Sequence, residues 1–379
     1  MNEKSKINVE KVLDNKVPDR IVYSPNYWQW FTHQKNHGLL DDEIKHCRSQ
    51  YDILSFLGVD IFSRNIYGDD QIYWWGGICD EYFENGEFKQ EKEIIDKNII
   101  YHKKFIGKSG ELSDELTFRF DASTLIQNKF FVDDYETQFR QFEEFVSARR
   151  WRFNPEKYKS AKEKYIGAHI VLGEVISPLK MLHLTMGPVN SVYFLMMRPD
   201  EAKAVLQMHE NAMLDVVREC ASYGVKTIMS MDNLDTPFHP PEYVENYCAS
   251  FYEKASSICH EYGSKFFIHA CGHQEANLKL ISSLKVDGLE GVAFPPVGDI
   301  DLEKVMSITP DNFIITGGLS AVETERLCSR REAFEYVEEV FRKMRPYSNR
   351  FIFASSCNTS INAKWETIKN IRDAWLVFR

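Results

Sequence analysis

The chain lacks any run of about 18 apolar residues, the length that a membrane-spanning helix requires. Near its start, Met1 to Lys6 lead into further charged residues instead of an apolar segment, so no secretory signal is expected. Lysines and arginines (46) are fewer than acidic residues (56), and the net charge of -10 disfavours non-specific binding to nucleic acid or to an anionic membrane. These absences predict a cytoplasmic protein that binds neither nucleic acid nor membrane.

The eight cysteines lack the regular spacing of a disulfide framework. In a chain of 379 residues, scattered cysteines are typical of reduced thiols in the cytoplasm. Four of them fall in segments with helical patterning, where we expect them to fill core or surface positions: Cys220, Cys248, Cys259 and Cys328. Two others, Cys271 and Cys357, stand just past strand-like apolar runs and are therefore better placed to carry chemistry.

From about residue 165 onward, strand-like apolar runs alternate with segments that show the 3.6-residue periodicity of helices. The predicted strands cover residues 168–176, 225–231, 264–270, 288–294, 312–317 and 350–355. The predicted helices cover residues 198–223, 241–262, 274–284, 301–308, 321–344 and 363–378. Repeated strand-then-helix order forces parallel strands joined by right-handed crossovers.

Two earlier strands complete the pattern, one near residues 20–23 and one at 59–64 after a helix at 41–57. The resulting eight strands predict a TIM (β/α)8 barrel, which belongs to the α/β class. An open doubly wound sheet is the alternative. No Gly-x-Gly-x-x-Gly turn follows any predicted strand, which disfavours the dinucleotide-binding form of that sheet.

Residues from 69 to about 120 interrupt this rhythm. They contain alternating apolar segments and the pair Asn85-Gly86, which is a strong signal for a β-hairpin. We therefore expect an antiparallel insertion that lies over one mouth of the barrel and is followed by a helix at 133–150. Because no linker or low-complexity tract divides the chain, residues 1–379 are predicted to form one domain with an N-terminal elaboration.

The strand ends of the predicted barrel carry side chains that bind metals. In a TIM barrel the active site lies at the carboxyl ends of the strands. His269 and Cys271 stand at one such end, two residues apart, so both side chains point to the same face, and Cys357 follows a later strand. Two sulfurs and an imidazole predict a tetrahedral zinc site with one open position, and the alternative is ordinary core packing.

Two carboxylates lie on or just past the predicted strands before and after the strand that carries His269. Glu290 is a candidate fourth zinc ligand and catalytic group, with a carboxylate that supports a ligand, or a plain polar strand end, as alternatives. Asp232 is a candidate catalytic residue that binds substrate or orients His269, and the alternative is a helix cap before the following prolines. Both roles follow from the position of these acids on the same rim.

Other residues are candidates for contact with a substrate. Asn233 directly follows Asp232, and we expect it to face the same mouth of the barrel. An aromatic-rich set that suits the wall of an apolar pocket consists of Tyr27, Trp28 and Trp30 with the later pair Trp74-Trp75. The alternative is that these aromatic residues pack together in an N-terminal layer.

These motifs resemble the uroporphyrinogen decarboxylase superfamily, and most closely its zinc-dependent branch of corrinoid methyltransferases, which includes methylcobamide:coenzyme M methyltransferases and O-demethylases. The resemblance covers roughly residues 172–379. It rests on five short segments: Met231-Asp232-Asn233, His269-Ala270-Cys271-Gly272, Gly288-Leu289-Glu290 leading to Pro295-Pro296-Val297-Gly298-Asp299, Thr316-Gly317-Gly318-Leu319 and Ser356-Cys357-Asn358. The His-x-Cys and later Cys are the specific part, since they mark the zinc-using members.

The resemblance implies that His269, Cys271 and Cys357 hold zinc. It implies further that the enzyme moves a methyl group between a small substrate and the cobalt of a separate corrinoid protein. Either a zinc-bound thiol attacks methyl-cobalt, or zinc activates an ether whose methyl group passes to cobalt(I). The aromatic N-terminal segment favours the second direction and an aryl methyl ether.

The decarboxylase activity itself is disfavoured because the segment Ile21 to Trp28 has no cluster of arginines to bind porphyrin carboxylates. Two alternatives to the methyltransferase are kept. One is a metal-free, decarboxylase-like lyase that uses Asp232. The other is a non-catalytic barrel that binds a corrinoid carrier and has the cysteines in its core.

Overall fold

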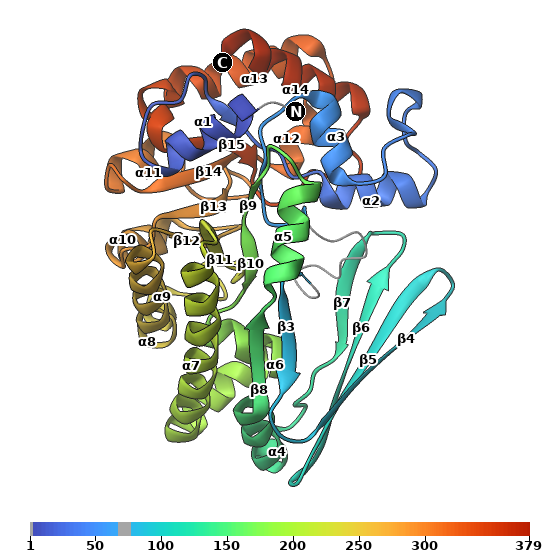
Figure 1. The fold of residues 1–379 in the computed structure, drawn as a ribbon, viewed down its shortest axis with the longest axis vertical. Helices are drawn as coiled ribbons and strands as arrows, with labels where there is room; N and C mark the ends of the chain where they lie inside the picture. Colours follow the sequence, from blue (N-terminus) through green and yellow to red (C-terminus); the bar gives the residue numbers. More distant parts are fainter. Residues whose placement is uncertain (1–2, 67–76) are drawn as a thin grey trace.

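A parallel sheet of seven strands forms most of the barrel wall in the computed structural model, which describes residues 3–66 and 77–379 (Figure 1). The order of its strands is β1-β15-β14-β13-β12-β11-β10. Their bounds are Val22–Tyr23 for β1, Leu172–Val175 for β10, Thr227–Ser230 for β11, Lys265–His269 for β12, Gly288–Val292 for β13, Ile314–Leu319 for β14 and Phe351–Ser355 for β15. Neighbours in space are mostly neighbours in sequence, as successive strand–helix units require.

The wall is closed by two short strands, β2 (Phe62–Ser63) and β9 (His169–Ile170), which pair in parallel. Strand β9 continues into β10 after a single residue. On the other side of β2, the Asp60 amide donates to the Tyr23 carbonyl at 2.9 Å, which links β2 to β1. With β9 and β10 taken as one interrupted strand, the structure confirms the predicted TIM barrel.

Helices surround the barrel wall (Figure 1). They are α1 Glu3–Leu13, α2 Trp28–Asn36, η1 Asp42–Ile44, α3 Gln50–Leu57, α5 Pro155–Lys164, α6 Pro178–Met197, α7 Pro199–Tyr223, α8 Pro241–Tyr247, α9 Ala249–Glu261, α10 Glu275–Ser283, α11 Leu302–Ile308, α12 Ala321–Arg326, α13 Arg330–Met344, η2 Arg345–Arg350 and α14 Trp365–Phe378. Within residues 3–66 and 77–379, none of these helices has the length and apolar character needed to cross a membrane.

Three predicted helices are each divided in the structure. The helix expected at 41–57 consists of η1 and α3, because Ser49 and Asp52 form a capping box that starts α3. The helix expected at 241–262 breaks at Cys248, which separates α8 from α9. The helix expected at 321–344 breaks because Ser329 and Glu332 form a capping box that starts α13. Helix α6 was not predicted, since Pro188 and the left-handed Gly187 (φ 77°) interrupt its helical pattern.

The chain between β2 and β9 adds antiparallel strands and a helix beside the barrel (Figure 1). Strand β3 (Cys79–Phe83) pairs with β8 (Arg149–Phe153), and helix α4 (Tyr135–Ala148) precedes β8. A separate four-stranded sheet consists of β4 Glu87–Ile95, β5 Asn98–Gly107, β6 Gly110–Arg119 and β7 Thr124–Lys129. These strands extend past the predicted limit of 120, and residues 69–76 of the predicted insertion lie outside the described residues.

The predicted Asn85-Gly86 hairpin is wrong. The turn joins β3 to β4, but these two strands belong to different sheets. The hairpin forms one strand later, between β4 and β5, where Asp96 and Lys97 both adopt positive φ angles of 48° and 68°. Two successive positive φ angles are the geometry of a type I′ turn, and here residues other than the usual Asn-Gly adopt it.

Candidate metal centre

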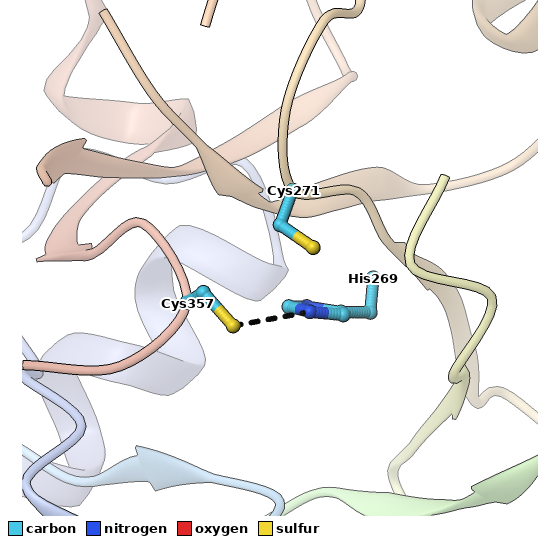
Figure 2. A group of neighbouring side chains, drawn as sticks. All are labelled: His269, Cys271 and Cys357. Atoms are coloured by element: carbon cyan, nitrogen blue, oxygen red, sulfur yellow. Dashed lines mark hydrogen bonds between the residues drawn. The ribbon is translucent and has the colours of Figure 1, made fainter. Parts of the chain in front are cut away.

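The side chains of His269, Cys271 and Cys357 meet at the carboxyl ends of the barrel strands (Figure 2). His269 ends β12, Cys271 follows two residues later, and Cys357 lies just past β15. One ligand atom from each residue lies within 4.8 Å of the others. The Cys357 Sγ is 3.6 Å from the His269 Nε2. Strands β13 and β14 separate β12 from β15 in the sheet, so curvature of the barrel brings the three together.

The donor set and its spacing fit a zinc ion. Zinc binds thiolate sulfur at about 2.3 Å and imidazole nitrogen at about 2.0–2.1 Å, so tetrahedral ligand atoms lie roughly 3.3–3.8 Å apart. The spacing of up to 4.8 Å needs only small side-chain rotations to reach those values. Two sulfurs and one imidazole leave a fourth position open, which is typical of a catalytic zinc site.

Glu290 contacts the ring of His269 on the side away from the thiols. The two residues are register partners in β12 and β13, and the Glu290 carboxylate accepts a hydrogen bond from the His269 Nδ1. Arg64 donates from its Nε to the same carboxylate oxygen at 3.3 Å. A carboxylate on one ring nitrogen aims the other nitrogen toward a metal position. The arrangement favours the supporting role for Glu290 over that of a fourth ligand.

The side chains around the candidate metal position shift one another's pKa values. Burial opposes ionisation of Glu290, but Arg64 and His269 outweigh it and lower the pKa of the carboxyl to about 2. Burial likewise disfavours a charged imidazole, yet Glu290 raises the pKa of His269 above its usual value. The hydrogen bond between the two thiols raises the pKa of Cys271 and lowers that of Cys357 well below its usual range. The site therefore favours a thiolate at Cys357.

The backbone of Gly291 lies close to the His269 ring and to the loop that carries Cys357. This residue has a φ of 103°, which side-chain-bearing residues rarely adopt. A Cβ atom here would lie 2.8 Å from the Ser356 carbonyl oxygen and 3.2 Å from the Cε1 of His269. Glycine is required because a larger residue would push the imidazole or the Cys357 loop away.

Asp232 lies at the end of β11 and is fully buried. Its Oδ1 accepts from the Ser177 amide at 2.8 Å, and its Oδ2 accepts from the Ser230 and Tyr252 hydroxyls at 2.8 and 2.6 Å. These bonds connect β11 to the start of α6 and to α9. The catalytic role of Asp232 stays a prediction, and the structure adds a role in holding three elements together.

The predicted substrate-contacting residues have different surroundings in the structure. Tyr27 is 1% exposed, and its hydroxyl lies 3.1 Å from that of Tyr23 inside the core. Trp28 packs in a cluster with Tyr101 and Phe118 of the inserted sheet. Asn233 has a φ of 49° and a buried side-chain oxygen with no hydrogen-bond partner among the described residues. Contact of these residues with substrate stays a prediction, and Trp74-Trp75 lies outside the described residues.

Sequence reasoning missed two residues that support the centre, Arg64 and Asn26. Arg64 follows β2 and contacts Glu290. The Asn26 side-chain amide donates to the Cys357 carbonyl at 2.8 Å and so fixes the loop that carries this thiol. Both follow barrel strands, so the rule that located His269 applies to them too.

A search of curated proteins found no match. Among solved structures, a methyltransferase from Methanosarcina mazei is similar over 99% of this chain and 98% of its own, with a TM-score of 0.61 and 12% identity. A B12-independent methionine synthase from Shewanella, in complex with selenomethionine, is similar over 94% of both chains, with a TM-score of 0.45 and 11% identity. The first likeness supports the fold, and the second carries no argument.

A family profile gives the more specific result. The profile of the uroporphyrinogen decarboxylase (URO-D) family matches residues 128–375. This segment is more than half of the chain, and it includes strands β9 to β15 with His269, Cys271 and Cys357. The chain therefore belongs to the uroporphyrinogen decarboxylase family.

Proposed function

We propose that this protein is a zinc-dependent methyltransferase of the corrinoid branch of its family. It moves a methyl group between a small substrate and the cobalt of a separate corrinoid protein. The observation that carries the proposal is the group of His269, Cys271 and Cys357, whose ligand atoms lie within 4.8 Å at the active-site end of the barrel. The similar structure from Methanosarcina mazei is of a methyltransferase, which agrees with this assignment.

Each residue of the centre has a distinct part in the proposal. His269, Cys271 and Cys357 hold the ion, and Glu290 fixes the imidazole ring with the help of Arg64. Bound zinc supplies Lewis acidity, which lowers the pKa of a coordinated thiol or draws charge from an ether oxygen. Because the cobalt must reach the substrate, the corrinoid protein docks over the carboxyl ends of the strands.

Two directions of transfer are consistent with this site. With an ether, the methyl carbon bonds to cobalt(I) while its bond to oxygen breaks, and the oxygen keeps the electron pair and gains a proton. With a thiol, the thiolate sulfur bonds to the methyl carbon of methyl-cobalt, which leaves cobalt(I), and the thiol proton goes to solvent. An aryl methyl ether is our preferred donor, although Tyr27 and Trp28 support it less than the sequence suggests because both pack in clusters.

Mixing the zinc-loaded protein with chemically reduced cob(I)alamin and a panel of methyl ethers and methylamines tests the proposal. We expect at least one donor to form methylcobalamin, read from its absorbance, and His269→Ala to form none. The reverse assay uses methylcobalamin and a panel of thiols. Cys328→Ser is the matched control, since this thiol is exposed and does not belong to the group of His269, Cys271 and Cys357. Zinc-loaded protein that is inactive in both directions would support the non-catalytic alternative, and chelator-resistant activity on a porphyrinogen would support the lyase.

Glu290→Gln tests the support of the imidazole. Glutamine has nearly the same size, but it lacks the charge that holds the Nδ1 proton and aims Nε2 at the metal. Loss of such a partner weakens metal binding by roughly 10–100-fold. Competition with a chromophoric chelator measures the zinc affinity, and Glu275→Gln, which only breaks an exposed ion pair with Lys304, serves as control. Equal zinc affinity in both variants contradicts this role of Glu290.

A further inference from the structure

Three basic side chains gather beside the metal centre without any assigned role. Lys180 and His183 lie one turn apart at the start of α6, a helix that begins just past strand β10. The ring of His239, in the loop after β11, packs edge-on against His183 with ring centroids 5.1 Å apart. Two elements thus bring an ammonium group and two imidazoles to the same end of the barrel.

Within residues 3–66 and 77–379, Lys180 has no direct counter-charge. Among the residues that the structure describes, no carboxylate forms an ion pair with its ammonium group, although Asp232 and Cys271 act on it electrostatically. Asp232 is not available for closer contact, because its two oxygens already accept from the Ser177 amide and from two hydroxyls. A partly buried lysine without a partner destabilises the protein unless something else neutralises it.

His239 is also unsatisfied. It is 2% exposed, and neither ring nitrogen has a hydrogen-bond partner in the described part of the chain. Its backbone is nevertheless held firmly, since its amide donates to the Asp235 carbonyl at 2.8 Å and its carbonyl accepts from Asn277 at 2.7 Å. Buried polar atoms are rarely left unpaired in a ligand-free core, so a fixed imidazole of this kind points to a missing partner.

The cluster adjoins the metal ligands through hydrogen bonds of the backbone. In the loop that bears His239, the Leu234 amide donates to the His269 carbonyl at 3.1 Å. In the same loop, the Asp235 carboxylate accepts from the His273 amide at 2.7 Å. The first turn of α6 is tied to Asp232 through Ser177. The basic side chains are therefore held next to the turn that carries His269 and Cys271.

We propose that Lys180, His183 and His239 bind the anionic group of the small substrate, a carboxylate, sulfonate or phosphate, whose reacting end lies at the metal centre. An ammonium group and imidazole N–H groups form charge-assisted hydrogen bonds with such an anion. The site thus selects substrates with a charge at one end and a thiol or methyl ether at the other. The reacting end rests on the proposed function, whereas the anion site can be tested by binding alone.

The ionisation of the cluster agrees with this assignment. Burial lowers the pKa of His183 to about 3 and that of His239 to about 4, with further lowering from their basic neighbours. Burial also lowers the pKa of Lys180. Without an anion, the two imidazoles are therefore neutral at pH 7 and still offer N–H donors.

Three thiols with three carbon atoms each test the proposal by calorimetric titration of the zinc-loaded protein: 3-mercaptopropionate, 3-mercaptopropanesulfonate and 3-mercaptopropanol. We expect at least one anion to bind at least about tenfold more tightly than the alcohol, because hydrogen bonds to charged groups are the strong ones. Comparison of the carboxylate with the sulfonate identifies which anion fits. In Lys180→Met and in His239→Phe the preference should fall to about twofold or less.

Lys157→Met is the matched control, since Lys157 holds the same position in α5, with a proline at the helix start and a capped amide. It should keep the preference of the unmodified protein. Lys180→Met should also raise the melting temperature without ligand, because it removes an unpaired charge.

Equal binding of all three thiols to the unmodified protein overturns the proposal. So does an unchanged preference in Lys180→Met, or a loss of zinc from that variant without a loss of preference. None of these readouts depends on methyl transfer, so an inactive protein that still prefers the anion contradicts the proposed function alone.

Discussion

His269→Ala and Cys357→Ser are each expected to leave the purified protein without zinc, whereas the unmodified protein carries about one ion per chain. Removing either side chain leaves two ligands from a set of three, and the remaining positions cannot enclose the ion. In the structure, the Nε2 of His269 and the Sγ of Cys357 are 3.6 Å apart and face the same point. Elemental analysis of protein purified without added zinc measures the effect directly.

Two controls test whether the zinc loss is specific to these ligands and whether the variant is folded. Cys328→Ser removes an exposed thiol between α12 and α13. This variant should retain zinc in full. Circular dichroism of His269→Ala should show the same helix content as the unmodified protein, because the barrel strands and helices do not depend on this ring. Full zinc occupancy in both His269→Ala and Cys357→Ser rules out the assigned site, and the cysteines would then be core residues.

The sequence predicts the barrel because strands and helices alternate with clear boundaries. All six strands predicted after residue 165 occur, although most are shorter at their ends than expected. The elements that could not be predicted are those interrupted by a local irregularity. Pro188 and Gly187 interrupt the helical pattern of α6. Strand β9 is separated from β10 by one residue, whose amide bonds to β2 instead. Such breaks depend on tertiary contacts that no local pattern records.

The grouping of His269, Cys271 and Cys357 was predictable for a specific reason. His269 and Cys271 lie two residues apart at the end of one strand, and parallel barrel strands place all their carboxyl ends at one rim. Glu290 was predicted at the same rim, but its contact with His269 depends on the register between β12 and β13, which no local pattern records. Lys180 and His183 were missed together with α6, although Ser177 before Pro178 is a recognisable helix start.

Asp232→Ala is expected to lower the free energy of unfolding by about 3–5 kcal/mol. The substitution strands three buried donors, namely the Ser177 amide and the hydroxyls of Ser230 and Tyr252. It also removes the carboxylate whose charge acts most strongly on Lys180. The ammonium group of Lys180 has no ion pair among the described residues. Urea unfolding followed by circular dichroism measures the loss. Asp301→Ala is the control, since this exposed aspartate starts α11 without a side-chain hydrogen bond to the helix.

The stability measurement separates two roles for Asp232. A catalytic carboxylate must offer an oxygen to substrate, but both oxygens of Asp232 already accept bonds from the protein and the side chain is fully buried. If its main role is to hold α6 and α9 against β11, Asp232→Ala loses stability, and it loses anion preference as well because Lys180 and His183 move with α6. If its role is purely catalytic, the variant keeps its unfolding free energy and its anion preference and loses only methyl transfer. We expect the first outcome, since three donors converge on this one carboxylate.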